Sequence, residues 1–232
     1  MLKVNGITKK FGELQALNNV SFEVGKGECL GIIGPNGAGK TTLFSVISGF
    51  LRPDKGDVRF KGISVVGKKP SYLAKMGLVR TFQLIKVFKN MSVGENLLVA
   101  NSNNPDFEKE ILKLIGLWDK KEMIAGNLSQ GELRRLSIGM ALATKPKVLL
   151  LDEPFSGLSV KEAENLSNII KQLEKDGITQ IIIEHKLKEL FGVADRVLVL
   201  NFGRVIFEGF ARDAVRDEKV IEAYFGQKHA KG

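Results

Sequence analysis

The chain has 232 residues, of which 44% are hydrophobic and 26% are charged, and its mean hydropathy is zero. This composition is typical of a globular protein and excludes a disordered polymer or a membrane-spanning protein. A chain of this length buries most of the surface that it exposes when unfolded, so it needs no disulfide or metal to fold. The only cysteine, Cys29, lies in an apolar run and is predicted to be a core residue, which is typical of a reducing, cytosolic compartment.

The net charge of +9 is unevenly distributed, because residues 1–80 carry 13 basic and five acidic side chains. Such a concentration suits nucleic acid, anionic lipid or a phosphate-bearing ligand, or is simply a solvated face. The sequence shows neither a signal-peptide pattern nor a run of about 20 apolar residues. We therefore expect any role at a membrane to depend on a partner.

Short apolar runs bounded by Gly, Asn, Asp and Pro predict strands, and apolar residues at helical spacing predict helices. From about 93 to 143 the spacing is helical, and little of this segment favours a strand. A further helix is predicted from Ser159 to Asp176, where Gly177 ends it, and short helices are expected in the charged tail. The predicted strands cover 20–24, 29–33, 58–60, 180–184, 196–200 and 204–208.

Strands that alternate with helices, several of them apolar throughout, indicate an α/β fold with a largely parallel sheet covered on both faces. The helical middle third is expected to be an insertion in that α/β core. No low-complexity linker or internal repeat divides the sequence, so we expect one domain over residues 1–232.

The strongest local pattern is a glycine-rich loop that fits the P-loop consensus of Gly, four residues, Gly, Lys and Ser or Thr. It lies between the apolar strand 30–33 and a predicted helix over 42–47, which is the context that the pattern requires. The loop directs backbone N–H groups at phosphate oxygens, and the helix N-terminus adds its positive dipole end. Lys40 is expected to reach the β- and γ-phosphates of ATP, and the Thr41 hydroxyl to hold Mg²⁺. The predicted nucleotide-binding residues of the loop are Gly34, Pro35, Asn36, Gly37, Ala38, Gly39, Lys40, Thr41 and Thr42.

A second pattern, residues 147–154, is a buried strand that ends in two adjacent carboxylates, Asp152 and Glu153. In open α/β sheets, ligands bind at the carboxyl ends of the strands. Asp152 suits a ligand of Mg²⁺, and Glu153, which points to the other side, is placed to orient and polarise the attacking water. Acidic residues at strand ends also serve as solubilising groups, but this pair follows a P-loop in the expected chain order.

Between these patterns, residues 127–136 form a Leu-Ser-x-Gly-Glu turn that opens an apolar helix, and Ser129 with Glu132 also fits a capping box. Together with the P-loop, this turn resembles the signature of ATP-binding cassette (ABC) ATPases, and the resemblance covers residues 2–226. It implies a P-loop NTPase (RecA-like) α/β core with a largely parallel sheet, an antiparallel β subdomain and a helical signature subdomain. The core and β lobe would occupy about 1–82 and 144–232, and the helical subdomain about 83–143.

The resemblance also implies roles for single residues. Phe11 falls where the family stacks an aromatic ring on adenine, Gln83 at the Q-loop that senses Mg²⁺ or the γ-phosphate, and His185 at the switch position that contacts the γ-phosphate. The resemblance implies that Ser129 and Gly131 contact ATP bound to the opposite subunit. In physical terms, a helix N-terminus would bind an anion there. The implied catalytic residues are Glu153, His185, Lys40 and Gln83, and the implied metal ligands are Thr41, Gln83 and Asp152.

Two positions depart from the commonest family pattern. Glu132 stands where Gln is usual, which brings a negative charge near a phosphate site unless the side chain caps its own helix. Ser159 stands where the family usually has Asp, which calls into question cross-subunit coupling through that side chain.

Residues 77–83, 86–100 and 220–226 resemble the ATPase subunits of branched-chain amino acid importers. The ATPase of lipopolysaccharide export has much the same pattern, so the transported substrate rests on analogy. Two further classes are a soluble cassette acting on nucleic acid or ribosomes, which the basic N-terminal third would suit, and a non-hydrolysing nucleotide-gated scaffold. The first usually carries two cassettes or a long coiled coil, which this sequence lacks. The intact set of Lys40, Asp152, Glu153 and His185 argues against the second.

The resemblance therefore implies a cytoplasmic Mg-dependent ATPase that works as a head-to-tail homodimer or heterodimer on the inner face of the cell membrane. Transmembrane permease subunits would attach it there by docking near Gln83 to Asn96, and no nucleic acid is expected as a partner. The apolar and basic segment 84–89 is a candidate groove for a short permease helix. In the structural alternative, Phe88 belongs to the core and Ile85 fills a gap below the helical insertion.

Overall fold

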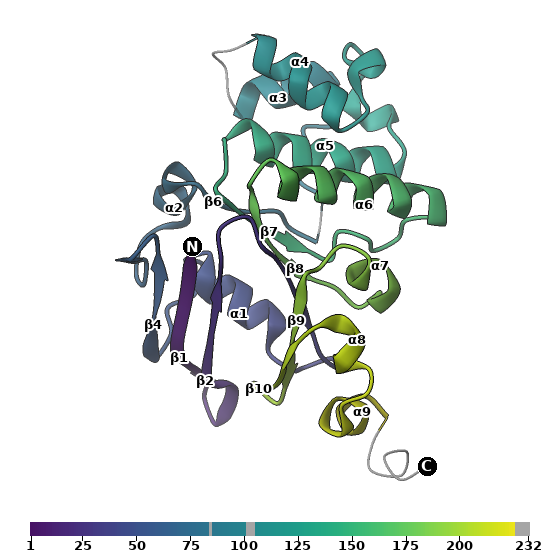
Figure 1. The fold of residues 1–232 in the computed structure, drawn as a ribbon. Coiled ribbons are helices and arrows are strands. Elements are labelled where there is room, and N and C mark those ends of the chain that lie inside the picture. The colour runs from purple at the N-terminus through teal and green to yellow at the C-terminus, as the bar shows by residue number, and fades with distance from the viewer. Residues whose placement is uncertain (84, 101–104, 226–232) are drawn as a thin grey trace.

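The computed structural model describes residues 1–83, 85–100 and 105–225, whose arrangement is shown in Figure 1. Leu84 and Gly226, which belong to segments singled out in the sequence, lie outside the described residues. The described chain forms a six-stranded sheet and a four-stranded sheet. The helices are α1 (Lys40–Ile47), α2 (Pro70–Met76), α3 (Val93–Ala100), α4 (Pro105–Leu114), α5 (Gln130–Ala143), α6 (Val160–Lys175), α7 (Leu187–Phe191), α8 (Ala211–Ala214) and α9 (Glu218–Phe225).

The six-stranded sheet has the strand order β10-β9-β3-β8-β7-β6. Neighbouring strands from β9 to β6 are parallel, and β10 runs antiparallel to β9. The largely parallel α/β sheet predicted from the sequence is therefore confirmed. Its strands are β3 (Cys29–Ile33), β6 (Leu78–Arg80), β7 (Val148–Asp152), β8 (Thr179–Ile183), β9 (Arg196–Asn201) and β10 (Arg204–Gly209).

Side chains of the parallel strands alternate between two hydrophobic cores. In β3, Cys29 and Ile33 belong to the core that includes residues of α5 and α6, whereas Leu30 and Ile32 belong to the core that includes α1 and the four-stranded sheet. Because both faces are covered, every residue of β3 is buried and the strand is apolar throughout. Burial also raises the pKa of the Cys29 thiol, as suits a core residue.

The four-stranded sheet is antiparallel, with the order β2-β1-β4-β5. Its first strand is absent from the predicted strands, because a bulge breaks the alternation that identifies a strand. Leu2 and Val4 are buried, but the pairing shifts at Gly6, so the next buried residue is Ile7. The strands of this sheet are β1 (Leu2–Phe11), β2 (Leu14–Val24), β4 (Lys55–Phe60) and β5 (Ile63–Ser64).

Helices α3, α4 and α5, with short 3₁₀ helices at 118–120 and 125–127, lie within residues 93–143 and confirm the helical character predicted there. Figure 1 shows α3 and α4 stacked on α5, with α6 on the opposite side of α5. Gly139 permits this close packing, because a Cβ on it would lie 2.6 Å from Ile115 Cδ1 of the preceding helix–loop segment.

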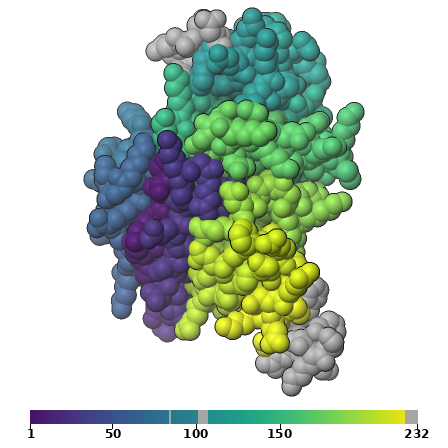
Figure 2. All heavy atoms as spheres, viewed as in Figure 1, coloured from purple at the N-terminus to yellow at the C-terminus, as the bar shows by residue number. Residues whose placement is uncertain are grey.

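The N-terminal strands lie beside the C-terminal third of the chain, as the purple and yellow-green surfaces of Figure 2 show. The Asn18 N–H donates to the Gly203 carbonyl oxygen over 2.8 Å, which joins β2 to the turn between β9 and β10. Within the part of the chain that the structure describes, no helix has the length and apolar character needed to cross a membrane.

Candidate functional site

The glycine-rich loop joins the buried strand β3 to α1, as the sequence predicts. Gly39 is the N-cap of α1 with a φ of 102°, and a Cβ there would lie 2.5 Å from the Ala16 carbonyl oxygen. Gly34 has a φ of 150°, and a Cβ on it would overlap the Leu200 carbonyl oxygen. Both positions require glycine, because the loop passes close to the backbones of β2 and β9.

Lys40 is the first residue of α1 and turns its ammonium group back into the loop. Its Nζ donates to the carbonyl oxygens of Gly34 and Pro35 over 2.7 and 3.0 Å. The side chain is buried, and burial lowers the pKa of Lys40, while the nearby charge of Glu153 acts in the opposite direction. A positive charge is therefore held inside the curve of the loop.

Glu153 follows β7 and has a φ of 48°, an uncommon conformation for a residue with a side chain. Its N–H donates to the Ile183 carbonyl oxygen over 2.9 Å. Its carboxylate accepts a hydrogen bond from Gln83 Nε2 at 2.9 Å and lies 3.3 Å from His185 Nε2. The structure thus brings together three of the residues singled out in the sequence, from the ends of three strands.

A cavity of about 440 Å³ lies at the phosphate loop. Its lining includes the loop residues from Asn36 to Thr42, together with Glu153 and His185. The lining also includes three exposed apolar side chains: Phe11, Leu14 and Phe202. Phe11 is 49% exposed, so it is not a core residue and its ring is available to a ligand in this cavity.

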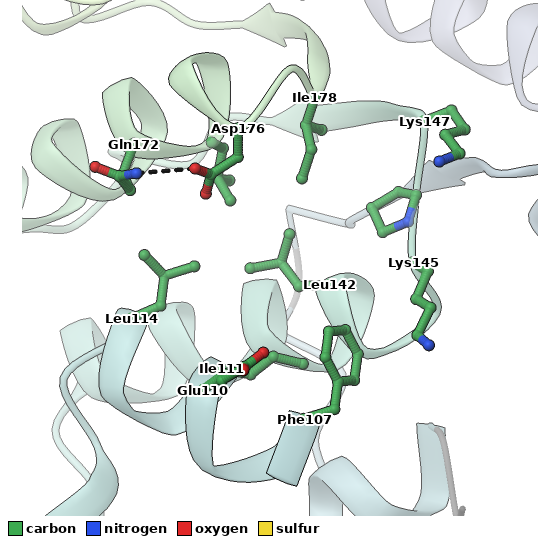
Figure 3. Close-up of a pocket in the computed structure, with 12 residues that line it drawn as sticks. Phe107, Glu110, Ile111, Leu114, Leu142, Lys145, Lys147, Gln172, Asp176 and Ile178 are labelled. Carbon is green, nitrogen blue, oxygen red and sulfur yellow. Dashed lines mark hydrogen bonds between the residues drawn. The ribbon is translucent and has the colours of Figure 1, made fainter. Parts of the chain in front are cut away.

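A different cavity, of about 560 Å³, lies between α4, the end of α5 and the end of α6 (Figure 3). Its lining is largely apolar and includes Phe107, Leu142 and Ile178. Lys147 and Ile178, which also line it, immediately precede β7 and β8. This cavity therefore lies at the amino ends of those strands, at the opposite edge of the sheet from Glu153 and His185.

The N-terminus of α5 is closed by a capping box between Ser129 and Glu132. The Ser129 hydroxyl accepts from the Glu132 N–H over 3.2 Å, and the Glu132 carboxylate accepts from the Ser129 N–H over 3.0 Å. Lys120 Nζ lies 2.5 Å from the same carboxylate. The negative charge of Glu132 is therefore occupied in capping its own helix.

A second capping box joins Ser159, the N-cap of α6, to Glu162. The Glu162 carboxylate also reaches α5, because Ser129 Oγ donates to its Oε1 over 3.5 Å and a Cβ on Gly131 would overlap that atom. The pKa of Glu162 lies below its ordinary value, chiefly because its carboxylate accepts hydrogen bonds from the N–H and the hydroxyl of Ser159. Hydrogen bonds from the Gly131 backbone and the Ser129 side chain lower it less. Ser129 and Gly131 thus face α6 of their own chain and do not line the cavity at the phosphate loop.

Two buried charged residues that sequence reasoning did not single out hold the site in place. Arg134 of α5 donates from Nη1 to the Gln83 carbonyl oxygen over 2.9 Å. The Glu184 carboxylate accepts from the N–H groups of Phe155 and His185 over 2.9 and 2.8 Å. The contacts of Arg134 with Gln83 and of Glu184 with Phe155 join residues that are 51 and 29 positions apart. In the sequence, the one indication of such a role is that each of these charged residues lies beside apolar residues predicted to be buried.

Taken together, the parallel sheet, the phosphate loop and the carboxylates at the neighbouring strand ends define a P-loop ATPase. The family model described as ABC transporter matches residues 17–156. The chain belongs to this family: it is the ATP-binding subunit of an ABC transporter, and it couples ATP hydrolysis to transport.

The full length of the chain is similar to known cassettes. A Methanocaldococcus jannaschii protein described as a probable branched-chain amino acid transport ATP-binding protein, LivG, is 39% identical, with 98% of each chain covered. The crystal structure of a nucleotide-free ATP-binding cassette from an ABC transporter is 35% identical and superposes with a TM-score of 0.90, covering 98% of this chain and 99% of the other. A dimeric post-hydrolysis structure of the cassette MJ0796, bound to ADP and phosphate, is 27% identical with a TM-score of 0.80 over 91% of this chain and 99% of the other.

The capping box of α5 predicts a pH-dependent contribution to stability. Burial alone would raise the pKa of Glu132, but hydrogen bonds from Lys120 and Ser129 and the charges of Lys120 and Arg135 lower it below its ordinary value. A depressed folded-state pKa stabilises the fold above the unfolded-state pKa, and this stabilisation is lost as the pH falls through the folded-state pKa. We expect Glu132→Gln to unfold at lower urea concentration than wild type at pH 7. The difference should shrink below about pH 4; a difference that stays constant with pH would contradict this prediction.

Proposed function

We propose that this chain hydrolyses Mg-ATP at sites shared between two subunits and thereby drives the import of branched-chain amino acids through transmembrane partners. The observation that carries the proposal is the meeting of Gln83, Glu153 and His185 beside the phosphate loop, at one edge of the sheet. The substrate is supported by the similarity over the full chain to LivG.

The cavity at the phosphate loop receives ATP. The backbone N–H groups of Gly34 and of residues 36–42 bind the phosphates, and Lys40 exchanges its two carbonyl acceptors for phosphate oxygens. The half-exposed ring of Phe11 stacks on adenine, a role supported by its place in the lining of the same cavity.

The residues present fit a magnesium ion. Mg²⁺ keeps several waters and is usually bound through one or two carboxylates together with substrate phosphates. Among the described residues, no group of three or more His, Cys, Asp or Glu side chains is arranged to hold a metal ion. Thr41, Gln83 and Asp152 would supply a hydroxyl, an amide and a carboxylate oxygen, respectively, as ligands. When bound, the ion neutralises charge on the β- and γ-phosphates.

Glu153 orients and polarises the attacking water. Its carboxylate is held by Gln83 on one side and by His185 on the other, so these two residues fix its position. Because a preorganised group needs no rearrangement at the moment of reaction, this arrangement favours hydrolysis. His185 and Gln83 are also placed to contact the γ-phosphate, and Lys40 reaches it from the loop.

The signature residues act on the nucleotide of a second subunit. Ser129 and Gly131 lie at a helix N-terminus, which favours anions, but outside the cavity of their own chain. A head-to-tail dimer would place them against the γ-phosphate in the opposite cavity. The dimeric structure of MJ0796 supports such an assembly.

The permease subunits dock on the described part of the segment after Gln83, residues 85–89, as far as Asn96. Phe88 is 50% exposed, so it does not belong to the core, contrary to the structural alternative. The buried Asn96 side chain binds both the N–H and the carbonyl of Phe88, over 2.7 and 3.0 Å. A rigid backbone that presents an exposed aromatic ring is typical of a docking anchor. Val87, in contrast, packs against the core.

This docking segment lies where the helical lobe, about 83–143, joins the core lobe, about 1–82 and 144–232. Gain or loss of the γ-phosphate at Gln83 tilts the helical lobe and moves the docked helix. The chain works at the inner face of the membrane through these partners, and nucleic acid has no part in this function.

We expect Glu153→Gln to keep ATP binding but to lose at least about a hundredfold in turnover, a barrier increase of about 2.7 kcal/mol or more, because only water activation is removed. Steady-state phosphate release and binding of a fluorescent ATP analogue would measure the two effects separately. The trapped ATP should also hold a stable dimer, visible by size-exclusion chromatography. Turnover close to that of wild type would refute the assignment of Glu153.

Two variants can separate the contacts that ATP makes with the subunit that binds it (in cis) from those it makes with the signature helix of the other subunit (in trans). Lys40→Ala should lose ATP affinity as a monomer, because the loop loses its cation, whereas Ser129→Arg should bind ATP normally yet fail to dimerise and hydrolyse. Mixing the two inactive proteins should restore activity, because a heterodimer contains one intact composite site. If Ser129→Arg hydrolyses ATP like wild type, the signature helix is not part of the site.

The docking proposal predicts that Phe88→Glu spares the fold and the basal ATPase rate but abolishes co-purification with the permease subunits and the turnover that they stimulate. Val215→Glu is the matched control, because Val215 is 51% exposed and lies in the C-terminal part of the chain. It should assemble normally. Normal assembly of a folded Phe88→Glu protein would refute the docking site. A collapsed melting temperature would also count against it, because it would show that the Phe88 side chain stabilises the fold.

A further inference from the structure

Arg80, the last residue of β6, forms a buried ion pair with Asp152, the last residue of β7. Arg80 Nη2 donates to Asp152 Oδ2 over 2.7 Å, and both side chains are 7% exposed. The two strands are parallel neighbours in the sheet, with Arg80 paired to Leu150. The pair therefore lies at the carboxyl edge of the sheet, directly beside Glu153.

The rest of the guanidinium group is enclosed by the helix that follows the phosphate loop. Arg80 Nη1 lies 3.2 Å from Ser45 Oγ, on α1, and 3.3 Å from Ser48 Oγ, at the C-cap of the same helix. Its Cζ lies 5.7, 6.0 and 5.3 Å from the ring centroids of Phe44, Phe50 and Phe82. The Nε atom is buried and has no hydrogen-bond partner among the described residues.

These contacts make Asp152 the main counter-charge of a cation that water does not solvate. Buried charges persist only when they are paired with good geometry, so this pair resists separation. The planar fork of arginine reaches the carboxylate and the two serines at once, which the single ammonium of lysine cannot do. Arg80 thus holds the Asp152 carboxylate in one orientation relative to α1 and the phosphate loop.

We propose that Arg80 is a positioning residue for divalent-cation binding: it orients Asp152 so that the cation arriving with the nucleotide meets a carboxylate already in place. The proposal rests on the proposed role of Asp152 as a metal ligand. Mg²⁺ accepts only near-ideal octahedral geometry, so a carboxylate that turns away is lost as a ligand. Partners that hold metal ligands in place typically change metal affinity by about 10- to 100-fold when removed.

Whether Arg80 strengthens or weakens cation binding at Asp152 depends on how completely its own charge is enclosed. A guanidinium group could also repel a nearby cation, which would make it a competitor for Asp152. Here its charge is compensated by the carboxylate at 2.7 Å and by three aromatic faces, so little of it acts beyond the pair. Loss of orientation is therefore expected to outweigh loss of repulsion.

The test measures metal binding without turnover. Wild type, Arg80→Lys and Arg80→Met are titrated with Mn²⁺ in the presence of a non-hydrolysable ATP analogue, and free Mn²⁺ is read by electron paramagnetic resonance. Both variants should bind Mn²⁺ about 10- to 100-fold more weakly, with unchanged affinity for the analogue in EDTA. Arg135→Lys is the matched control: Arg135 donates to the Ile115 carbonyl oxygen over 2.6 Å and does not contact Asp152, so its variant should behave like wild type.

Two results would overturn the proposal: unchanged Mn²⁺ affinity in folded Arg80→Lys, or tighter Mn²⁺ binding by Arg80→Met, which would make Arg80 a competitor. If neither Arg80 variant folds, Ser48→Ala decides, because it removes one Nη1 acceptor and leaves the ion pair in place. Weaker Mn²⁺ binding by Ser48→Ala supports the proposal, and unchanged binding refutes it.

Asp152→Asn separates this proposal from the proposed function. If Asp152→Asn itself leaves Mn²⁺ binding unchanged, the metal role of Asp152 is wrong, and the Arg80 proposal falls with it. If Asp152→Asn weakens Mn²⁺ binding while Arg80→Lys and Arg80→Met do not, only the positioning role of Arg80 is refuted.

Discussion

The order of the parallel strands is the constraint on which the rest of the site depends. Four adjacent strands, β3, β8, β7 and β6, each deliver one part of the site at their carboxyl ends. In that order, these parts are the phosphate loop, His185, the Asp152–Glu153 pair and Gln83. The strand register, in which Asp152 pairs with Ile183 between β7 and β8, fixes the positions of the residues that follow these two strands. The hydrogen bond from the Glu153 N–H to the Ile183 carbonyl oxygen extends this pairing by one residue. A slip of one residue would turn every side chain to the other face.

Buried charges around this edge are held by the protein itself. Lys40 donates to loop carbonyls, Glu184 accepts from backbone N–H groups, and Arg134 donates to the Gln83 carbonyl oxygen. Arg80 and Asp152 are paired with each other. Such groups would be costly without partners, so each one is fixed in direction as well as in place. The site is therefore largely organised by contacts within the protein, and such preorganisation is how electrostatic stabilisation becomes efficient.

The sequence predicts those parts of the site whose geometry is set by local main-chain pattern. Glycine spacing identifies the loop at Gly34 and Gly39, and an apolar run ending in carboxylates identifies the edge at Asp152. It fails where local alternation is broken, as at Gly6 in β1, or where a contact joins distant residues. Arg80 and Asp152 are 72 positions apart, and Glu162 reaches Ser129 across 33 positions. No periodicity encodes such pairs; they follow only from the packing of the strands and helices.

The contacts of Arg134 connect the nucleotide site to the signature helix. Arg134 is buried in α5 close to its N-terminus, where Ser129 is the cap, and its guanidinium group holds the carbonyl oxygen of Gln83. The amide of the same Gln83 donates to Glu153. Since a packed interior transmits displacement, a shift of Gln83 away from Glu153 has to move α5 or break a hydrogen bond to a buried guanidinium group. The second outcome costs a buried guanidinium group its shorter hydrogen bond and leaves it only the Phe82 carbonyl oxygen, at 3.3 Å, among the acceptors recorded for it. Movement of the helix as a unit avoids this loss.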